Sequence, residues 1–229
     1  MDIELFNENN TDVCSRIDRK FDFIYADCMY ENKDFSWLEP AIRCLSKNGI
    51  FIIQTDYHTV ADYKSIMNEW WDITFVNWLI YMNNWGGTPK NRFAQKHDDI
   101  LVYCNGTNWK WYPDRIQIPK ATAGTKFDKR GTGTKTPPSV FYDHPSFSTM
   151  SNEREEVNGK NFSMQKPLWL MERLLLPFTD EGDNVLDLFM GTGTLGEVCV
   201  KLSRNYCGIE SDADTFEVSK KRVHNESFI

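Results

Sequence analysis

The fold of this chain is decided by the stretch Asn184-Val-Leu-Asp-Leu-Phe-Met-Gly-Thr-Gly-Thr-Leu-Gly196. Residues 185–189 form a short apolar run of strand length, which breaks at Gly191 and Gly193 before a helical pattern begins. Glycine at these positions lets the main chain turn sharply and approach a ligand closely. The following helix offers unpaired N–H groups and a positive dipole end to an anionic group. The stretch therefore predicts a strand, a tight turn and a helix that cradle a cofactor, the alternative being a turn without a ligand.

A second strand is predicted at residues 206–209, and it ends at Glu210, roughly 20 residues beyond the glycines. A carboxylate at the carboxyl end of such a strand can accept hydrogen bonds from both hydroxyls of a ribose. The turn lacks the third glycine of a dinucleotide fingerprint, and Phe189 and Met190 replace the smaller residues usual in nicotinamide enzymes. The pattern favours a cofactor that has a ribose but is not a dinucleotide.

These residues carry a family resemblance. The run Asp187-Leu-Phe-Met-Gly-Thr-Gly-Thr194, preceded by Gln165-Lys166-Pro167 and by Leu174-Leu175, resembles the S-adenosylmethionine half of the amino-group DNA methyltransferases. In the circularly permuted branch of that family the catalytic half comes first and the cofactor half last, as in this chain. The resemblance implies a three-layer, Rossmann-like α/β fold with a mostly parallel sheet and an antiparallel hairpin strand.

The resemblance also implies a cofactor site. Family members have an acidic residue near the position of Asn9, where it contacts the adenine amino group, and an amide oxygen can accept the same bond. Lys166, at the start of the helix predicted over residues 165–178, is expected to meet the methionine carboxylate of the cofactor. The full set of expected cofactor residues is Asn9, Asp27, Lys166, Asp187, Phe189, Gly191, Thr192, Gly193, Thr194 and Glu210.

The expected catalytic residues follow an apolar strand at residues 21–26. They are Asp27, Cys28, Met29 and Tyr30, where the family has Asp-Pro-Pro-Tyr. The exocyclic nitrogen of adenine is a poor nucleophile because its lone pair is delocalised into the ring. The Asp27 carboxylate and the Cys28 carbonyl are suited to accept its two N–H bonds and free that lone pair, while Tyr30 stacks on the flipped base.

The two residues that replace the prolines decide between alternatives. Cys28 and Met29 keep the carbonyl group but lose the fixed φ of proline, and each adds an N–H that needs a partner. We expect an adenine-N6 methyltransferase that is slower or more specialised than its relatives. The alternatives are a cytosine-N4 or RNA methyltransferase and a catalytically impaired module that binds DNA and cofactor.

Length and composition indicate one globular domain. The chain has 229 residues, 41% of them hydrophobic, which suits one sizeable α/β domain and is too short for two. The resemblance divides it into a catalytic half (residues 1–106), a target-recognition insertion (107–160) and a cofactor-binding half (161–229). Members of the family often pair, so a homodimer or a partner subunit is also expected.

The net charge of −7 disfavours a nucleic-acid binder, but the charges are unevenly distributed. Residues 110–135 hold seven basic side chains against two acids, interleaved with aromatic and glycine residues. Such a segment suits contacts with phosphates and stacking on bases, and an ordinary surface insertion is the alternative. The residues expected to contact double-stranded DNA are Arg92, Lys110, Lys126, Lys129, Arg130 and Lys135.

The cysteines, the histidines and the apolar runs indicate the cellular compartment and whether a metal is used. The six cysteines show no Cys-x-x-Cys pairing and mostly lie in apolar runs, which predicts buried thiols in a reducing compartment. The histidines lack ligand spacing, so no metal is expected. No apolar run approaches the ~18 residues of a membrane span, and a cytoplasmic protein is predicted. Solubility is the only role expected of Lys201, Lys220, Lys221 and Arg222.

Overall fold

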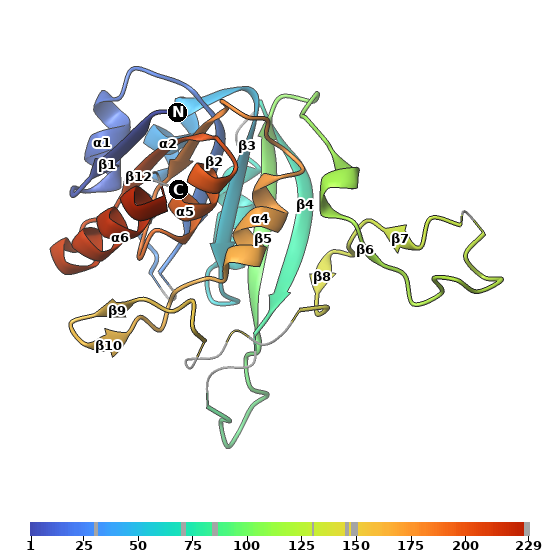
Figure 1. Cartoon of the computed structure of the whole chain (residues 1–229). Coiled ribbons are helices and arrows are strands. Elements are labelled where there is room, and N and C mark those ends of the chain that lie inside the picture. The colour runs from blue at the N-terminus through green and yellow to red at the C-terminus, as the bar shows by residue number, and fades with distance from the viewer. Residues whose placement is uncertain are drawn as a thin grey trace.

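Eight strands form one sheet in the order β1-β12-β11-β2-β3-β5-β4-β8 (Figure 1). The computed structural model describes residues 1–29, 32–69, 72–83, 87–129, 131–144, 147 and 151–226. Neighbouring strands from β1 to β3 are parallel, whereas β5 is antiparallel to both β3 and β4. The predicted α/β fold with a mostly parallel sheet and an antiparallel hairpin is confirmed.

The first part of the chain supplies the strands at the centre and one edge of the sheet. Its elements are β1 (Ile3–Phe6), α1 (Asn10–Arg16), β2 (Phe21–Asp27), α2 (Leu38–Cys44), β3 (Leu45–Thr55), α3 (Val60–Met67), β4 (Ile73–Met82) and β5 (His97–Asn105).

The last part of the chain returns to the sheet beside β2. Its elements are α4 (Leu168–Leu175), β11 (Asn184–Asp187), α5 (Thr194–Lys201), β12 (Asn205–Ile209) and α6 (Ala213–Glu226). β11 inserts between β2 and β12, so strands from both ends of the chain lie side by side. Residues far apart in the sequence therefore meet at the carboxyl ends of these strands.

Two apolar cores cover the two faces of the sheet and make three layers. Along β2, Ile24 and Ala26 pack with α1, α2 and α3, whereas Phe23 and Tyr25 pack with α4, α5 and α6. This split follows from the period of two in a strand, whose successive side chains point to opposite faces. Because both faces are buried, β2 reads as a continuous apolar run, which is typical of a parallel sheet.

The pairing of β2 with β3 is irregular, and its register shifts between Phe21 and Phe23. One local prediction was wrong. The helix expected over residues 165–178 is shorter, because α4 begins at Leu168 with Pro167 as its N-cap residue. Lys166 consequently lies in the extended segment that leads into α4 and not on the helix itself.

The middle of the chain contains short pieces of structure. A 3₁₀ turn (Pro113–Ile116) leads into the antiparallel ribbon of β6 (Ile118–Pro119) and β7 (Thr134–Lys135), which extends away from the sheet in Figure 1. β8 (Val140–Phe141) then joins the edge of the main sheet beside β4, and β9 (Glu156–Val157) pairs with β10 (Lys160–Asn161). The division of the chain at residues 106 and 160 stays a prediction.

Candidate active site

Three acidic residues lie at the carboxyl ends of neighbouring parallel strands. Asp27 ends β2, Asp187 ends β11, and Glu210 follows β12 directly. The strand order places β11 between the other two, so the three carboxylates share one edge of the sheet. This is the edge at which open α/β sheets bind ligands.

The glycine turn connects β11 to α5 at the same edge. Gly191 and Gly193 have φ values of 54° and 79°, in the left-handed region that favours glycine. The N–H of Gly191 donates to Glu210 Oε2 at 2.9 Å, so the turn and the acid hold each other in place. The predicted strand, tight turn and helix are all present.

Thr192 and Thr194 complete the turn through buried polar contacts. The Thr192 hydroxyl donates to Gln165 Oε1 at 3.2 Å, and Thr194 is the first residue of α5. Arg222 of α6 donates from Nη1 to the Thr192 carbonyl at 3.4 Å and to Thr194 Oγ1 at 3.1 Å, while its Nε donates to Glu197 Oε2 at 2.5 Å. Arg222 is buried, so the expectation that it serves solubility alone was wrong.

Asp187 is almost fully buried. Its Oδ2 accepts a hydrogen bond from the Tyr206 hydroxyl at 3.0 Å, and its Oδ1 is buried without a hydrogen-bond partner among the described residues. Burial raises the pKa of Asp187 to about 7, against the lowering effect of the Tyr206 hydrogen bond. A buried carboxylate oxygen without a partner is costly, which marks this atom as a position for a donor or a cation.

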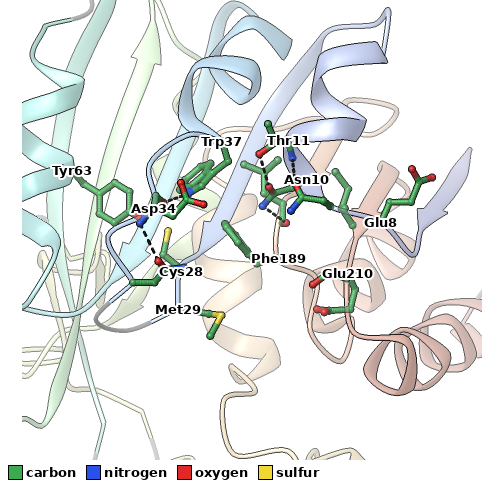
Figure 2. A pocket seen from close by; sticks show the side chains of 15 residues that line it. Glu8, Asn10, Thr11, Cys28, Met29, Asp34, Trp37, Tyr63, Phe189 and Glu210 are labelled. Carbon is green, nitrogen blue, oxygen red and sulfur yellow. Dashed lines mark hydrogen bonds between the residues drawn. The ribbon is translucent and has the colours of Figure 1, made fainter.

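Two adjoining cavities open at this edge. The larger, of about 400 Å³, is lined by Asp27, Lys166, Asp187 and the glycine turn. The smaller, of about 140 Å³, lies against α1 and α2, and both are lined by Cys28, Met29, Phe189, Glu210 and Ser211. Figure 2 shows the Phe189 ring in the middle of the smaller cavity, between Cys28 and Glu210. The two cavities together form a site with an acidic and an aromatic part.

The wall of the smaller cavity is built by α1 and α2. The ring of Trp37 meets that of Phe189 edge to face, with centroids 5.2 Å apart. The side chain of Asn9 accepts from the Thr11 N–H at 2.8 Å and caps α1, whereas Asn10 Nδ2 donates to the Leu188 carbonyl at 3.2 Å. Asn9 lines the smaller cavity, and its contact with a cofactor stays a prediction.

Asp27 is held by a buried lysine. Lys166 Nζ lies 2.7 Å from Asp27 Oδ2 and 3.7 Å from an oxygen of Asp98. Burial raises the pKa of Asp27, and the positive charge of Lys166 offsets part of this rise. Burial alone would lower the pKa of Lys166, but the two carboxylates outweigh it and the pKa is raised. Lys166 and Asp27 thus stabilise each other's charged form, and Asp27 Oδ1 has no partner among the described residues.

A chain of buried polar groups continues from this pair. Asp98 accepts from Gln54 Nε2 at 2.8 Å and from Asn83 Nδ2 at 3.1 Å. Gln54 Oε1 in turn accepts from the Tyr25 hydroxyl at 2.7 Å. Asp98, Gln54 and Asn83 are each less than 9% exposed, so these contacts are shielded from water.

Cys28 continues the strand pairing beyond the end of β2. Its N–H donates to the Gln54 carbonyl at 2.9 Å, which is the partner that a residue other than proline requires here. The thiol is buried, and burial raises its pKa well above the ordinary value, which disfavours a thiolate at this position. Met29 is 67% exposed at the mouth of both cavities, and Tyr30 lies outside the described residues.

The basic residues expected to contact DNA fall into two groups. Lys110 forms ion pairs with Asp183 at 2.6 Å and Asp180 at 3.0 Å, which tie it to the segment before β11. The exposed group is Arg92, Lys126, Lys129 and Lys135, while Arg130 lies outside the described residues. Lys129 and Lys135 line a hollow of about 570 Å³ along the β6–β7 ribbon.

Other expectations concern cysteines, metals and membranes. All six cysteines are buried free thiols, as predicted. Within the described ranges no cluster of three or more histidine, cysteine or acidic side chains is placed to hold a metal ion. No helix in the described part of the chain is long and apolar enough to cross a membrane.

Several site residues were missed at the level of the sequence. Gln54 and Asp98 are polar residues near the ends of buried apolar strands. Asp27 was identified from the same kind of position, so this signal could have identified Gln54 and Asp98 too. The residues missed in this way are Tyr25, Trp37, Gln54, Asn83, Asp98, Gln165 and Arg222.

Comparison with known proteins gives a consistent family. The model of a DNA methylase family, the N6/N4 methyltransferases, matches residues 20–221. M2.MboI from Moraxella bovis, a type II methyltransferase, is 46% identical over 208 residues, which are 84% of this chain and 65% of that protein. M.HpaI from Haemophilus parainfluenzae, also a type II methyltransferase, is 29% identical over 192 residues, which are 83% of this chain and 58% of that protein.

Two solved structures share the fold. M1.HpyAVI in its complex with SAM superposes with a TM-score of 0.71 at 24% identity, covering 96% of this chain and 98% of that one. The cytosine-N4-specific PvuII DNA methyltransferase also gives 0.71, at 13% identity, covering 97% of this chain and 86% of that one.

The strand contact of Cys28 can be tested by restoring the proline of the family pattern. Cys28→Pro removes the N–H that binds the Gln54 carbonyl and should lower the free energy of unfolding by ~1 to 3 kcal/mol. Cys28→Ala retains the N–H and is the matched control. Thermal unfolding should show a lower Tm for Cys28→Pro than for Cys28→Ala, whereas equal values would show that the hydrogen bond does not stabilise this edge.

Proposed function

This chain belongs to the N6/N4 DNA methylase family, and we propose that it transfers a methyl group from S-adenosylmethionine to the exocyclic amino group of a DNA base, adenine N6 being the expected acceptor. The observation that carries the proposal is Asp27, which lines a cavity shared with the glycine turn and whose buried Oδ1 has no hydrogen-bond partner among the described residues. The chain spans 58% of M.HpaI and 65% of M2.MboI, so the activity of a longer protein is part of the proposal.

The acidic part of the site suits a cationic cofactor. S-adenosylmethionine brings a methyl group on a positively charged sulfur, which keeps the bonding electron pair when the methyl group leaves, and it also carries an ammonium group. Asp187 Oδ1 is the buried acceptor whose missing partner such an ammonium group would supply. Gly191 and Gly193 let the main chain approach the ligand closely beside it.

The second part of the site suits an adenosine. Glu210 is oriented by the N–H groups of Gly191 and Asp212, each at 2.9 Å, and each carboxylate oxygen retains a lone pair for a ribose hydroxyl. Phe189 and Trp37 form an aromatic wall in the smaller cavity, against which a purine can pack. Asn9 stays the proposed contact of the adenine amino group.

The target amino group would be activated by hydrogen bonding. Asp27 Oδ1 and the Cys28 carbonyl accept its two N–H bonds and release the nitrogen lone pair from the ring. The nitrogen uses that pair to form the new bond to carbon, becomes positively charged, and returns to neutrality by losing one proton to Asp27 and then to water. The hydrogen bond from Cys28 N–H to Gln54 stiffens this segment where relatives have proline, which supports an active enzyme over an impaired binding module.

Contact with double-stranded DNA is proposed for the exposed basic residues. Lys126, Lys129 and Lys135 lie on or beside the β6–β7 ribbon, where they can bind phosphates without reading sequence. Arg92 lies on the segment before β5. Tyr30 is proposed to stack on the flipped base, and pairing with a second copy or another subunit stays part of the proposal.

Removal of the Asp27 carboxylate tests the proposed reaction. Asp27→Ala should lower methyl transfer to DNA by ~10²-fold or more, because the amino group loses its charged acceptor. Binding of S-adenosylmethionine, measured by calorimetry, should persist. The methylated products are identified by mass spectrometry of the nucleosides. The control is Glu217→Ala, which removes an exposed acid on α6.

The wild-type product decides between the bases in the same experiment. N6-methyladenine supports the proposal in full, and N4-methylcytosine keeps the mechanism but changes the base. Full activity of Asp27→Ala would overturn the assignment of Asp27, and a wild-type protein that methylates no DNA would overturn the proposed substrate.

The pH dependence of cofactor binding tests Asp187. Its pKa of about 7 means that the free protein holds a proton there at lower pH, and a cation binds only after that proton is lost. The affinity for S-adenosylmethionine should therefore rise with pH up to about 7 and then level off. Asp187→Asn should abolish this slope, and an unchanged slope in that variant would contradict the assignment.

The raised pKa of Asp187 also determines how the stability of the fold changes with pH. Because the folded pKa of Asp187 is raised, its contribution to stability is present at low pH and is lost as pH rises through about 7. Stabilisation by the cofactor should accordingly be larger at pH 8 than at pH 6. The groups facing Asp187 from the packed elements are Asp27 on β2, Tyr206 on β12, Glu210 after β12 and Cys199 on α5.

A further inference from the structure

We propose that Lys166, anchored on Asp98, is a positioning residue that holds Asp27 through Oδ2 and so fixes the carboxylate that accepts the amino group of the target base. The inference rests on the proposed function, because it concerns how Asp27 accepts that amino group. It assigns Lys166 a different role from the cofactor contact expected from the sequence.

The geometry of Lys166 supports this role. Its Nζ lies 2.7 Å from Asp27 Oδ2 and 3.4 Å from the Met164 carbonyl, and only 7% of the side chain is exposed. The segment before α4 brings Lys166 to the end of the sheet where β2 finishes and β5 begins. Lys166 and Asp27 meet there although they are 139 residues apart in the chain. The ammonium group therefore binds one oxygen of the carboxylate and leaves the other without a partner among the described residues, in a side chain that lines the larger cavity.

Asp98 anchors the lysine without facing the substrate. It is 2% exposed, and its two oxygens accept hydrogen bonds from Gln54 and Asn83. Gln54 is the residue paired with Asp27 between β2 and β3, and its carbonyl binds the Cys28 N–H. Gln54 thus positions Asp98, Asp27 and Cys28. The Asp27 carboxylate and the Cys28 carbonyl are the groups that would receive the target amino group.

The charges of the cluster suit the reaction. Two carboxylates and one ammonium group carry a formal net charge of −1, so the cluster keeps one negative charge beside the substrate although Lys166 is bound to Asp27. The attacking nitrogen becomes positive as the new bond forms, and a fixed negative charge nearby stabilises it. A lysine paired with Asp27 alone would cancel that charge.

The two anchoring residues act on Asp27 in opposite directions. The Lys166 charge lowers the pKa of Asp27 and the Asp98 charge raises it, on top of the rise caused by burial. The other titratable groups that face the cluster are Cys28 next in the chain, Asp187 on β11, Tyr81 on β4 and Arg154 before β9. Removing the charge of Lys166 should therefore raise the pKa of Asp27, and removing the charge of Asp98 should lower it.

The test compares Lys166→Gln, Lys166→Arg and Asp98→Asn in the full chain. Lys166→Gln should move the acid limb of kcat/KM for DNA up by about one pH unit or more, with activity recovering at high pH. Lys166→Arg keeps the charge and should keep the acid limb near its wild-type position. Asp98→Asn should move the limb to lower pH and lower kcat, because the cluster becomes neutral. Lys47→Gln, at an exposed lysine in β3, is the charge-matched control.

Two further measurements make the result independent of turnover. The pKa of Asp27 is followed by ¹³C NMR of the aspartate carboxyls, its signal being identified by its loss in Asp27→Asn, and it should rise in Lys166→Gln and fall in Asp98→Asn. The Kd for S-adenosylmethionine, measured by calorimetry, should be unchanged in both variants.

The outcomes separate the inference from the proposed function. A wild-type protein without methyl transfer refutes the function, and the NMR titration still tests the influence of Lys166 on Asp27. An active wild type whose Asp27 pKa is unmoved by Lys166→Gln overturns the inference. Loss of cofactor affinity of tenfold or more in Lys166→Gln, with the acid limb in place, would instead assign Lys166 to the cofactor carboxylate.

Discussion

Burial of three carboxylates along one edge of a sheet is the constraint on which the site depends. Asp27, Asp187 and Glu210 lie at the ends of adjacent strands, and burial raises the pKa of each. A buried carboxylate is stable only with donors or cations beside it. The protein supplies Lys166 to Asp27 and main-chain N–H groups to Glu210, whereas Asp187 accepts from the Tyr206 hydroxyl and its Oδ1 has no partner among the described residues. This requirement at Asp187 is the basis of the proposed preference of the site for a cationic ligand.

Sequence patterns predicted those parts of the fold that depend on neighbours in the chain. The apolar runs gave the strands, and Gly191 and Gly193 gave the turn, because only local geometry was needed. The contact between Lys166 and Asp27 joins residues 139 positions apart, and no periodicity encodes it. Arg222 looked like a solvated helix residue because its burial depends on how α6 packs on α5. The start of α4 was placed too early because Pro167 was taken as a helical residue instead of its cap.

The departure from the Asp-Pro-Pro-Tyr pattern has a structural counterpart in this chain. Proline fixes the backbone through its ring, whereas Cys28 is fixed by one more hydrogen bond of the β2–β3 pairing. The acceptor belongs to Gln54, whose side chain also binds Asp98, so backbone and side-chain positioning meet in one residue. Loss of two prolines therefore does not by itself imply a loose catalytic segment.

The most direct test of this account is a crystal structure of the protein with S-adenosylmethionine bound. We expect the cofactor ammonium group within hydrogen-bonding distance of Asp187 Oδ1, the ribose hydroxyls on Glu210, and Lys166 still paired with Asp27. Each carboxylate would then have its own partner. A cofactor that leaves Asp187 Oδ1 without a partner and draws Lys166 onto its own carboxylate would contradict the account.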